Sequence, residues 1–327
     1  MAKKTSAKRA FDWRTYSKPA RHLTDAQEEA FVSGRLAGIL QWTHEDPRTR
    51  FEIRARQAGL YHRGVSLARI GGEGPFSVEI DGTDGTVADR HEVAGDQDVL
   101  RLIERLSSES ARVDAAIGGG SETRHRRSFA AAIAAGNCGS DLASDGLIAL
   151  DTDYALGRRK LDLAVVLRSE GVAGPGGFAN PELAFIDVRV PGQTLTGQGG
   201  LAPLAEDFAD YAKALSGEHV RRSCEELAAL AAQKVRLGLL PGDLDLRSIS
   251  EGLPHLVIAF AERDPSAQES TAPLVEIHER LSARHYPTTR LHFVHFTLVP
   301  ESGDGLAVGE DDLMDYRAFK AYRATLG

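Results

Sequence analysis

The chain has 327 residues, enough for two ordinary domains of about 100–200 residues each. Its composition, 42% hydrophobic and 26% charged, excludes a disordered chain, and its two cysteines, Cys138 and Cys224, exclude a disulfide framework or a cysteine zinc site. No apolar run approaches the roughly 20 residues that span a bilayer, and the N-terminus lacks the hydrophobic segment of a signal peptide, so we expect a cytoplasmic protein without membrane contact.

Residues 1–23 form a basic arm. Up to residue 21 a single acid, Asp12, opposes its cations, which are Lys3, Lys4, Lys8, Arg9, Arg14, Lys18 and Arg21. Such a segment can contact phosphates, or it can be a solvated, solubilising tail. The net charge of −8 argues weakly against broad adhesion to nucleic acid, so the local distribution of charge matters more.

Residues 24–117 predict a small α+β domain. Thr24 and Gln27 have the spacing of a capping box, which predicts a helix that ends before Pro47. Three β-type stretches follow, separated by glycine-containing turns: Phe51–Ala55, Leu60–Ile70 and Phe76–Ile80. A second helix is expected over Asp98–Ile117.

Residues 118–300 predict a second, α/β domain that begins at a glycine hinge, 118–121. The expected helices are Glu122–Ala135, Ala202–Leu215, His219–Leu237 and Leu274–Ala283. The expected strands are Leu147–Ala155, Lys160–Leu167, Leu183–Val190, His255–Ala261 and Leu291–Val299. Three successive strands followed by helix and strand predict a mixed central sheet flanked by helices. Residues 301–327 are expected to form an acidic tail with a short helix.

Two aspartates interrupt otherwise aliphatic strands. Strand alternation places Asp162 on the face opposite Leu161 and Leu163, and it places Asp187 on the same face as Arg189. If these strands pair antiparallel, the two carboxylates converge and suit Mg²⁺ or Mn²⁺. A cation there would activate water, and Arg189 would stabilise the charge of the attacked phosphate. Alternatively, the aspartates form structural salt bridges to nearby basic residues, which are Arg159, Lys160 and Arg189.

These segments resemble the PD-(D/E)XK nuclease superfamily. Leu147–Leu156 looks like its first strand, Arg159–Val166 like the strand that opens with a metal-binding aspartate, and Ala184–Val190 like its acid-x-lysine strand. The resemblance implies a restriction-endonuclease-like core that binds metal through Asp162, Asp187 and the Val188 carbonyl.

The resemblance also assigns the lysine position of this motif to Arg189. Glu122 and Asp153 are further candidates for the metal shell, and a solvated edge position is the alternative for Asp151 and Asp153. Arginine can hold a phosphate but cannot transfer a proton.

Two basic clusters flank this site: Arg124, Arg126 and Arg127 in one, and Arg158, Arg159 and Lys160 in the other. They either contact a nucleic-acid backbone or lie on water-facing surfaces. The Tyr61-His62-Arg63-Gly64 segment resembles one in bacterial proteins with nuclease-like halves, and we interpret it as a hairpin turn with Arg63 exposed.

The sequence therefore predicts a metal-dependent nuclease that acts on DNA, with RNA as the other substrate, in bacterial defence or repair. The alternative is an inactive nuclease-fold protein that binds nucleic acid or serves as a scaffold. The expected protein partners are a second copy of the chain or a protein bound through the first domain.

Overall fold

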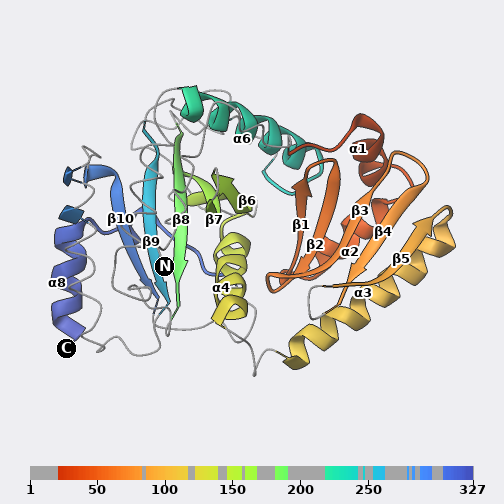
Figure 1. The fold of residues 1–327 in the computed structure, drawn as a ribbon, viewed down its shortest axis with the longest axis horizontal. Helices are drawn as coiled ribbons and strands as arrows, with labels where there is room; N and C mark the ends of the chain where they lie inside the picture. The colour runs from red at the N-terminus through yellow and green to blue at the C-terminus, as the bar shows by residue number, and fades with distance from the viewer. Residues whose placement is uncertain are drawn as a thin grey trace, which may run out of the picture.

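The computed structural model describes residues 21–82, 86–116, 122–138, 146–156, 159–167, 181–190, 218–241, 246, 253–261, 278–279, 282–283, 288–296 and 305–326. They form two five-stranded sheets with helices, so the prediction of a mixed α/β chain is confirmed (Figure 1). The expected hinge at 118–121, the helix at Ala202–Leu215 and most of the helix at Leu274–Ala283 lie outside the described residues. In the part of the chain that the structure describes, no helix is long and apolar enough to cross a membrane.

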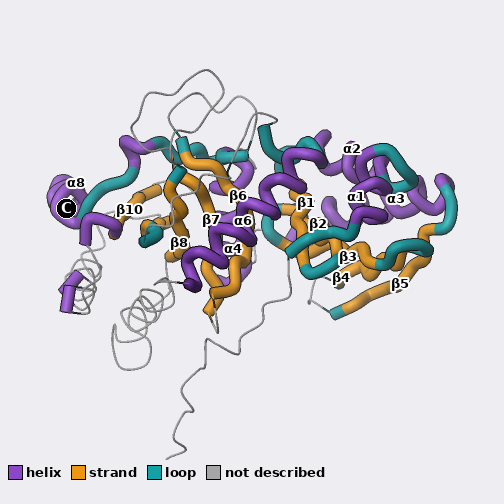
Figure 2. Tube along the Cα trace, turned by 90° about the horizontal axis from the view of Figure 1, so that it is seen from above, coloured by secondary structure: helices purple, strands orange, loops and turns teal. Residues whose placement is uncertain are grey.

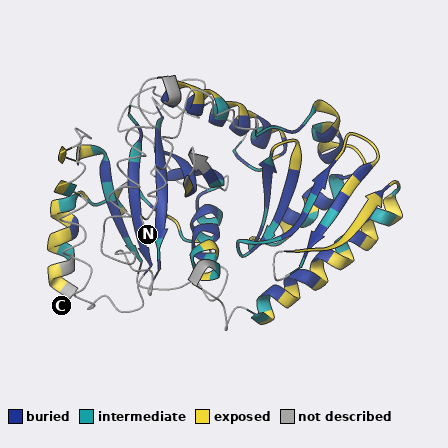
Figure 3. Ribbon diagram, in the orientation of Figure 1, coloured by how far each residue is buried: buried dark blue, intermediate teal, exposed yellow. Residues whose placement is uncertain are grey.

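The first sheet is an antiparallel meander in the order β1-β2-β3-β4-β5. Its strands are β1 (Thr49–Arg54), β2 (Gln57–His62), β3 (Val65–Gly71), β4 (Phe76–Asp81) and β5 (Val87–Val93). Three helices accompany it: α1 (Asp25–Val32), α2 (Ala37–Glu45) and α3 (Asp96–Ala116). The β-type stretch expected over Leu60–Ile70 contains the turn between β2 and β3, which fits the hairpin expected at Tyr61–Gly64. Strand β5 was not expected because its residues are exposed except for Val93 (Figure 3).

The helix expected from Thr24 to Pro47 is divided into α1 and α2. The capping box at Thr24 is present, since the Thr24 hydroxyl accepts from the Gln27 backbone and the Gln27 side chain accepts from the Thr24 backbone. The division follows Val32, where the chain turns and Gly34 approaches the α1 backbone too closely for a side chain. A Cβ at Gly34 would lie 2.9 Å from the Cα of Ala30.

The second sheet has the order β10-β9-β8-β7-β6. Its strands are β6 (Leu147–Leu156), β7 (Arg159–Leu167), β8 (Glu182–Arg189), β9 (His255–Ala261) and β10 (Leu291–Phe296). Strands β6, β7 and β8 pair antiparallel, and β9 and β10 continue the sheet in parallel with β8, so the sheet is mixed as expected. The main helices of this half are α4 (Glu122–Gly136), α6 (Glu218–Arg236) and α8 (Tyr316–Leu326).

Two apolar cores cover the two faces of this sheet. Phe129 and Ile133 of α4 pack with Leu163, Val165 and the neighbouring inward residues of β8 and β9. On the other side, α6 buries a stripe that belongs to a core continuous with that of the first sheet: Val220, Cys224, Leu227, Leu230 and Ala231. Helix α6 thus connects the two halves, as it reaches from the second sheet toward α1 (Figures 1 and 2).

Buried polar contacts also join the halves. The Lys234 ammonium of α6 lies 2.6 Å from the Glu52 carboxylate of β1, and both side chains are almost fully buried. Arg54 of β1 donates to the Asp151 carboxylate of β6 at 2.7 Å. Buried charges of this kind persist only when they are paired, so the first sheet and the second are held in a defined relation.

Candidate functional site

The Asp162 carboxylate lies where strands β7 and β8 stop pairing. Their backbone register runs from Leu167 opposite Glu182 to Leu163 opposite Ile186. Two positions beyond Ile186, the Val188 N–H donates to the Asp162 side chain at 2.7 Å. A side-chain oxygen thus bonds the β8 backbone just past the end of the ladder.

Strand alternation is interrupted at this position. Leu161 and Leu163 were expected on one face, but Leu161 packs into the core shared with the first sheet, whereas Leu163 packs into the core under α4. That assignment of faces was wrong, because the chain leaves the regular pleat as the ladder ends. The departure allows the Asp162 side chain to approach both β8 and α4.

The Asp162 and Asp187 carboxylates lie together, and both pair with the Arg126 guanidinium. Nη2 of Arg126 on α4 is 2.7 Å from an Asp162 oxygen and 2.6 Å from an Asp187 oxygen. Nε of Arg126 donates to Asp162 as well, at 2.9 Å, and Arg189 pairs with the second oxygen of Asp187. Asp162 is 8% exposed and Asp187 only 1%, so the two acids and two arginines form a nearly buried charge cluster.

The protonation of Asp162 is strongly perturbed. Burial and then the neighbouring Asp187 charge raise its pKa to about 7, although the Arg126 guanidinium and the Val188 N–H both lower it. A carboxyl group that titrates near neutrality in a cleft is a recognised sign of a functional site.

Other expected site residues are distributed around this cluster. Arg124 donates to the Ala116 carbonyl at 3.3 Å, and Lys160 is exposed. Glu122 is the first residue of α4, one helical turn before Arg126. Arg158 and the side chains of Glu122 and Arg159 lie outside the described residues.

Asp151 and Asp153 have different environments. Asp151 is fully buried and paired with Arg54 and Arg21, so a solvated edge position is wrong for this residue. Asp153 is half-buried with a φ of 51°, a left-handed conformation that is uncommon for a residue other than glycine. The two aspartates therefore do not act as one ligand pair.

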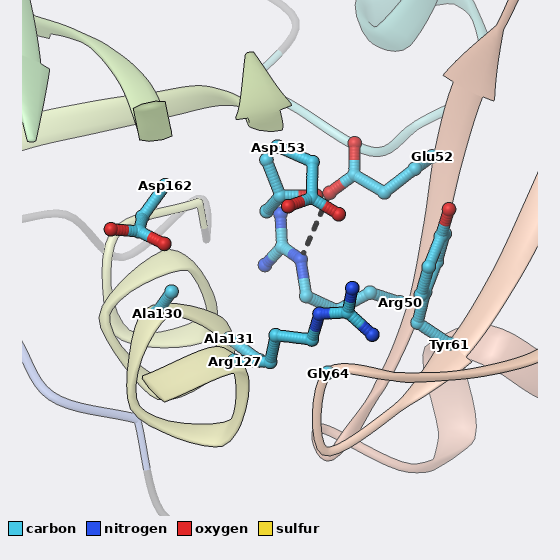
Figure 4. Close-up of a pocket in the computed structure, with 10 residues that line it drawn as sticks. Arg50, Glu52, Tyr61, Gly64, Arg127, Ala130, Ala131, Asp153 and Asp162 are labelled. Carbon is cyan, nitrogen blue, oxygen red and sulfur yellow. Dashed lines mark hydrogen bonds and ion pairs between the residues drawn. The ribbon is translucent and has the colours of Figure 1, made fainter. Parts of the chain in front are cut away.

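A small pocket of about 30 Å³ opens beside Asp162, between α4 and the first sheet (Figure 4). It is lined by Arg50, Glu52, Tyr61, Gly64, Arg127, Ala130, Ala131, Thr152, Asp153 and Asp162. Arg50, Glu52 and Tyr61 were not expected at the site. The charges at positions 50 and 52 alternate with Phe51 and Ile53, as in an ordinary half-buried strand, so nothing in the sequence places them beside Asp162.

Within the described ranges, no group of three or more histidine, cysteine, aspartate or glutamate residues has an arrangement that could hold a metal ion. The two carboxylates that converge, Asp162 and Asp187, do so on the Arg126 guanidinium. Comparison of the chain with protein families, with curated proteins and with solved structures finds no match.

Proposed function

We propose that the second half has a restriction-endonuclease-like core and hydrolyses phosphodiester bonds of nucleic acid with Mg²⁺ or Mn²⁺. The observation that carries this proposal is the convergence of Asp162 and Asp187, from adjacent antiparallel strands, on a single positive group. The element order supports it: α4, three antiparallel strands, α6 and then a parallel strand. The proposed substrate is DNA, with RNA as the alternative.

Asp162 and Asp187 could supply two of the oxygen ligands that a divalent cation takes, and the Arg126 guanidinium lies where the proposed ion would sit. One nitrogen already lies within hydrogen-bonding distance of both carboxylates, so one ion could contact both. Asp162 and Asp187 would hold the ion, with the Val188 carbonyl, Glu122 and Asp153 as further proposed ligands. When bound, the ion lowers the pKa of a water ligand and polarises a phosphoryl oxygen.

Two arginines would then act on the phosphate. Nε of Arg189 is buried and has no hydrogen-bond acceptor among the described residues, so it is a donor available for a phosphate oxygen. Arg126, once displaced from the carboxylates, would also be close enough to bind that phosphate. Both stabilise developing negative charge, and neither can accept a proton because arginine stays charged.

A cleavage assay at low salt tests the proposal. Plasmid, linear duplex, single-stranded DNA and RNA are incubated with Mg²⁺, with Mn²⁺ or with a chelator. We expect metal-dependent cutting that Asp187→Asn reduces at least about 100-fold, since the proposed ligand charge is lost. Asp89→Asn, which changes an exposed aspartate of β5 paired with His91, is the control and should retain activity.

A second candidate function is non-catalytic binding by a nuclease-like fold. The specific observation in its favour is that Arg126 already pairs with both carboxylates. On this reading no metal displaces Arg126, and Arg189→Lys, which restores the residue of the motif, still gives no cutting and no metal binding. Cutting by the wild-type chain that is lost in Asp187→Asn would exclude this candidate.

A further inference from the structure

The part of α4 that carries Arg126 precedes the part that is packed on the second sheet. Burial along α4 begins at Phe129, which joins Ile133 in the core of that sheet, whereas residues 124–128 are half-buried or exposed. The Arg126 guanidinium nevertheless has a defined place on the two aspartates. This first part of the helix therefore depends on those ion pairs and on contacts from the first half for its position.

The first half contacts α4 through the turn between β2 and β3. Gly64 has a φ of +76°, and a Cβ there would lie 2.3 Å from the Arg127 carbonyl oxygen and 3.1 Å from the Ser128 nitrogen. Figure 4 shows Gly64 beside Arg127, at the small pocket, whose volume of about 30 Å³ has room for about one or two water molecules. The turn thus lies directly against the helix backbone, next to Arg126.

The same turn is bonded to α3. His62 is buried between Thr49, at 3.1 Å, and Asp114 of α3, at 2.9 Å. Nε of Arg63 donates to the same Asp114 oxygen at 2.7 Å, and the Arg63 side chain is only 10% exposed, so the expectation that Arg63 is exposed was wrong. The turn is therefore fixed to the end of α3 by a buried imidazole and a nearly buried guanidinium.

Arg63 is an unusual residue for this turn. Both central residues, Arg63 at a φ of 47° and Gly64, have a left-handed backbone, as in a type I′ turn. Asparagine or aspartate followed by glycine is the preferred pair there, since few other residues tolerate a positive φ. An arginine at this position has a conformational cost, and its bond to Asp114 is the interaction that offsets it.

Two contacts therefore connect the end of α3 with the start of α4. Arg124 of α4 donates to the Ala116 carbonyl of α3 at 3.3 Å. The Tyr61–Gly64 turn bonds α3 on one side and lies against Arg127 of α4 on the other. Arg126 lies between these two contacted positions of α4, so the place of its guanidinium depends on the first half.

We infer that the Tyr61–Gly64 turn positions Arg126 on the two aspartates and so controls how readily a divalent cation enters between them. The bond between Arg63 and Asp114 fixes the turn for this role. The inference rests on the proposed function and adds its control by the first half. Arg63 is a positioning residue, because it acts through α4 and not on the ion.

Arg63→Asn separates this role from the stability of the turn. Asparagine before glycine suits the left-handed backbone, so the hairpin should fold, but the bond to Asp114 is lost. In calorimetric titration of the full chain, we expect Mn²⁺ to bind at least about fivefold more tightly than in the wild type, because Arg126 then competes less firmly for the aspartates. Arg63→Lys, which keeps a cation for Asp114, should return the affinity most of the way to that of the wild type.

Two comparisons assign the effect to Arg126. In the Arg126→Gln background, Arg63→Asn should leave the Mn²⁺ affinity unchanged, since the competing guanidinium is already absent. Arg56→Asn is the matched control, because Arg56 also has a left-handed backbone, at a φ of 53°, between β1 and β2. Its side chain is exposed and has no ion-pair partner among the described residues, so this variant should behave like the wild type.

A second measurement does not require metal. Loss of one charge-assisted hydrogen bond should let the first part of α4 open more often. Hydrogen exchange of the backbone amides of residues 124–128 should therefore be about tenfold faster in metal-free Arg63→Asn than in the wild type, and exchange in β9 should be unchanged.

The outcomes distinguish this inference from the proposed function. Tighter Mn²⁺ binding in Arg126→Gln with unchanged affinity in Arg63→Asn leaves the metal site and overturns the positioning role. An effect of Arg63→Asn that persists in the Arg126→Gln background overturns it too, since the effect would not pass through Arg126. Absence of Mn²⁺ binding in every variant removes the metal site of the proposed function. In that case faster exchange at residues 124–128 supports the turn as the anchor of Arg126, and unchanged exchange overturns it.

Discussion

Arg126 is expected to stabilise the metal-free protein but to oppose binding of the proposed metal ion. It pairs with two carboxylates that are almost completely buried, and the proposed divalent cation would have to displace it to reach them. Two adjacent acids without a counter-ion would be costly, since like charges at this separation repel strongly in a low-dielectric environment.

Arg126→Gln should therefore destabilise the metal-free protein by about 3 kcal/mol. In the variant, Mn²⁺ should restore much of the loss and should bind more tightly than in the wild type, since no guanidinium competes with it. Thermal unfolding and calorimetric titration with Mn²⁺ measure the two effects. Arg221→Gln, an exposed arginine of α6, should show neither. Equal Mn²⁺ affinity of Arg126→Gln and the wild type would contradict a metal site at the aspartates.

A second cluster of titratable side chains lies at the opposite ends of the central strands. His255 of β9 bonds His292 of β10 through Nδ1 and Nε2 at 2.7 Å, and its other nitrogen lies 2.7 Å from Glu182 of β8. Burial lowers the pKa of both imidazoles, and for His292 the charges of His255 and Arg290 add to burial to bring the pKa to about 4. The charges of Glu182 and Asp315 act in the opposite direction on His292.

These shifts predict a loss of stability on acidification. The unfolded imidazole takes up a proton near pH 6.5, whereas folded His292 does so only near pH 4, so stability falls as the pH drops between these values. His292→Gln keeps a donor toward His255 and does not titrate. Between pH 7 and 5 it should lose less unfolding free energy than the wild type, by about 1–2 kcal/mol. His91→Gln, at an exposed histidine, should follow the wild type in denaturant titrations at both pH values.

At the scale of elements, the hairpin β2–β3 is held against helix α4 by a single glycine. Gly64 requires a left-handed backbone and also approaches the α4 backbone more closely than any side chain would allow. Gly238 has a similar φ, +69°, but a Cβ there would meet nothing closer than 3.8 Å. A comparison of substitutions at Gly64 and Gly238 therefore separates the free-energy cost of the left-handed backbone from the cost of the close contact with α4.

Gly64→Ala should lower the unfolding free energy by about 3 kcal/mol, and Gly238→Ala by about 1 kcal/mol, which is the conformational cost alone. Denaturant titration of both variants gives the difference. Equal losses would mean that the hairpin can move away from α4 without penalty. Both variants are compared in the full-length chain, in which the contact between Gly64 and α4 is present.

The elements that could be predicted are those with a strong apolar pattern. His255–Ala261 is a strand over the expected residues, since the six consecutive apolar residues after His255 are typical of a buried strand. Val87–Val93 was missed because an edge strand exposed on both sides carries no alternation. The proximity of Asp162 and Asp187 follows from strand pairing, but Arg126 depends on where α4 packs, and local sequence does not contain that information.

At the scale of the whole molecule, a buried ion pair links the two halves. Burial alone would raise the pKa of Glu52, but the charges of Lys234, Arg50 and Arg54 outweigh it and hold the pKa well below its usual value. The contribution of Glu52 to stability is therefore present above about pH 4.5 and is lost as the pH falls below that value.

Lys234→Met should destabilise the protein by about 3 kcal/mol, because it leaves Glu52 buried with weaker partners. Adding Glu52→Gln should recover part of the loss, since the second change removes the uncompensated charge. Unfolding free energies of the two single variants and the double variant give the coupling between the sites. Lys320→Met on exposed α8 should have no effect, and additive losses at positions 52 and 234 would contradict the pairing.

The distance along the chain between Glu52 and Lys234 has a consequence for synthesis. The two residues are separated by 182 positions, and Leu23 and Gln233, which exchange two hydrogen bonds, by 210. At about 5–20 residues per second, the ribosome completes the first sheet many seconds before it reaches α6. Until then the Glu52 carboxylate must remain hydrated, so the N-terminal sheet emerges early but can reach its final packing only after the C-terminal partner has been translated.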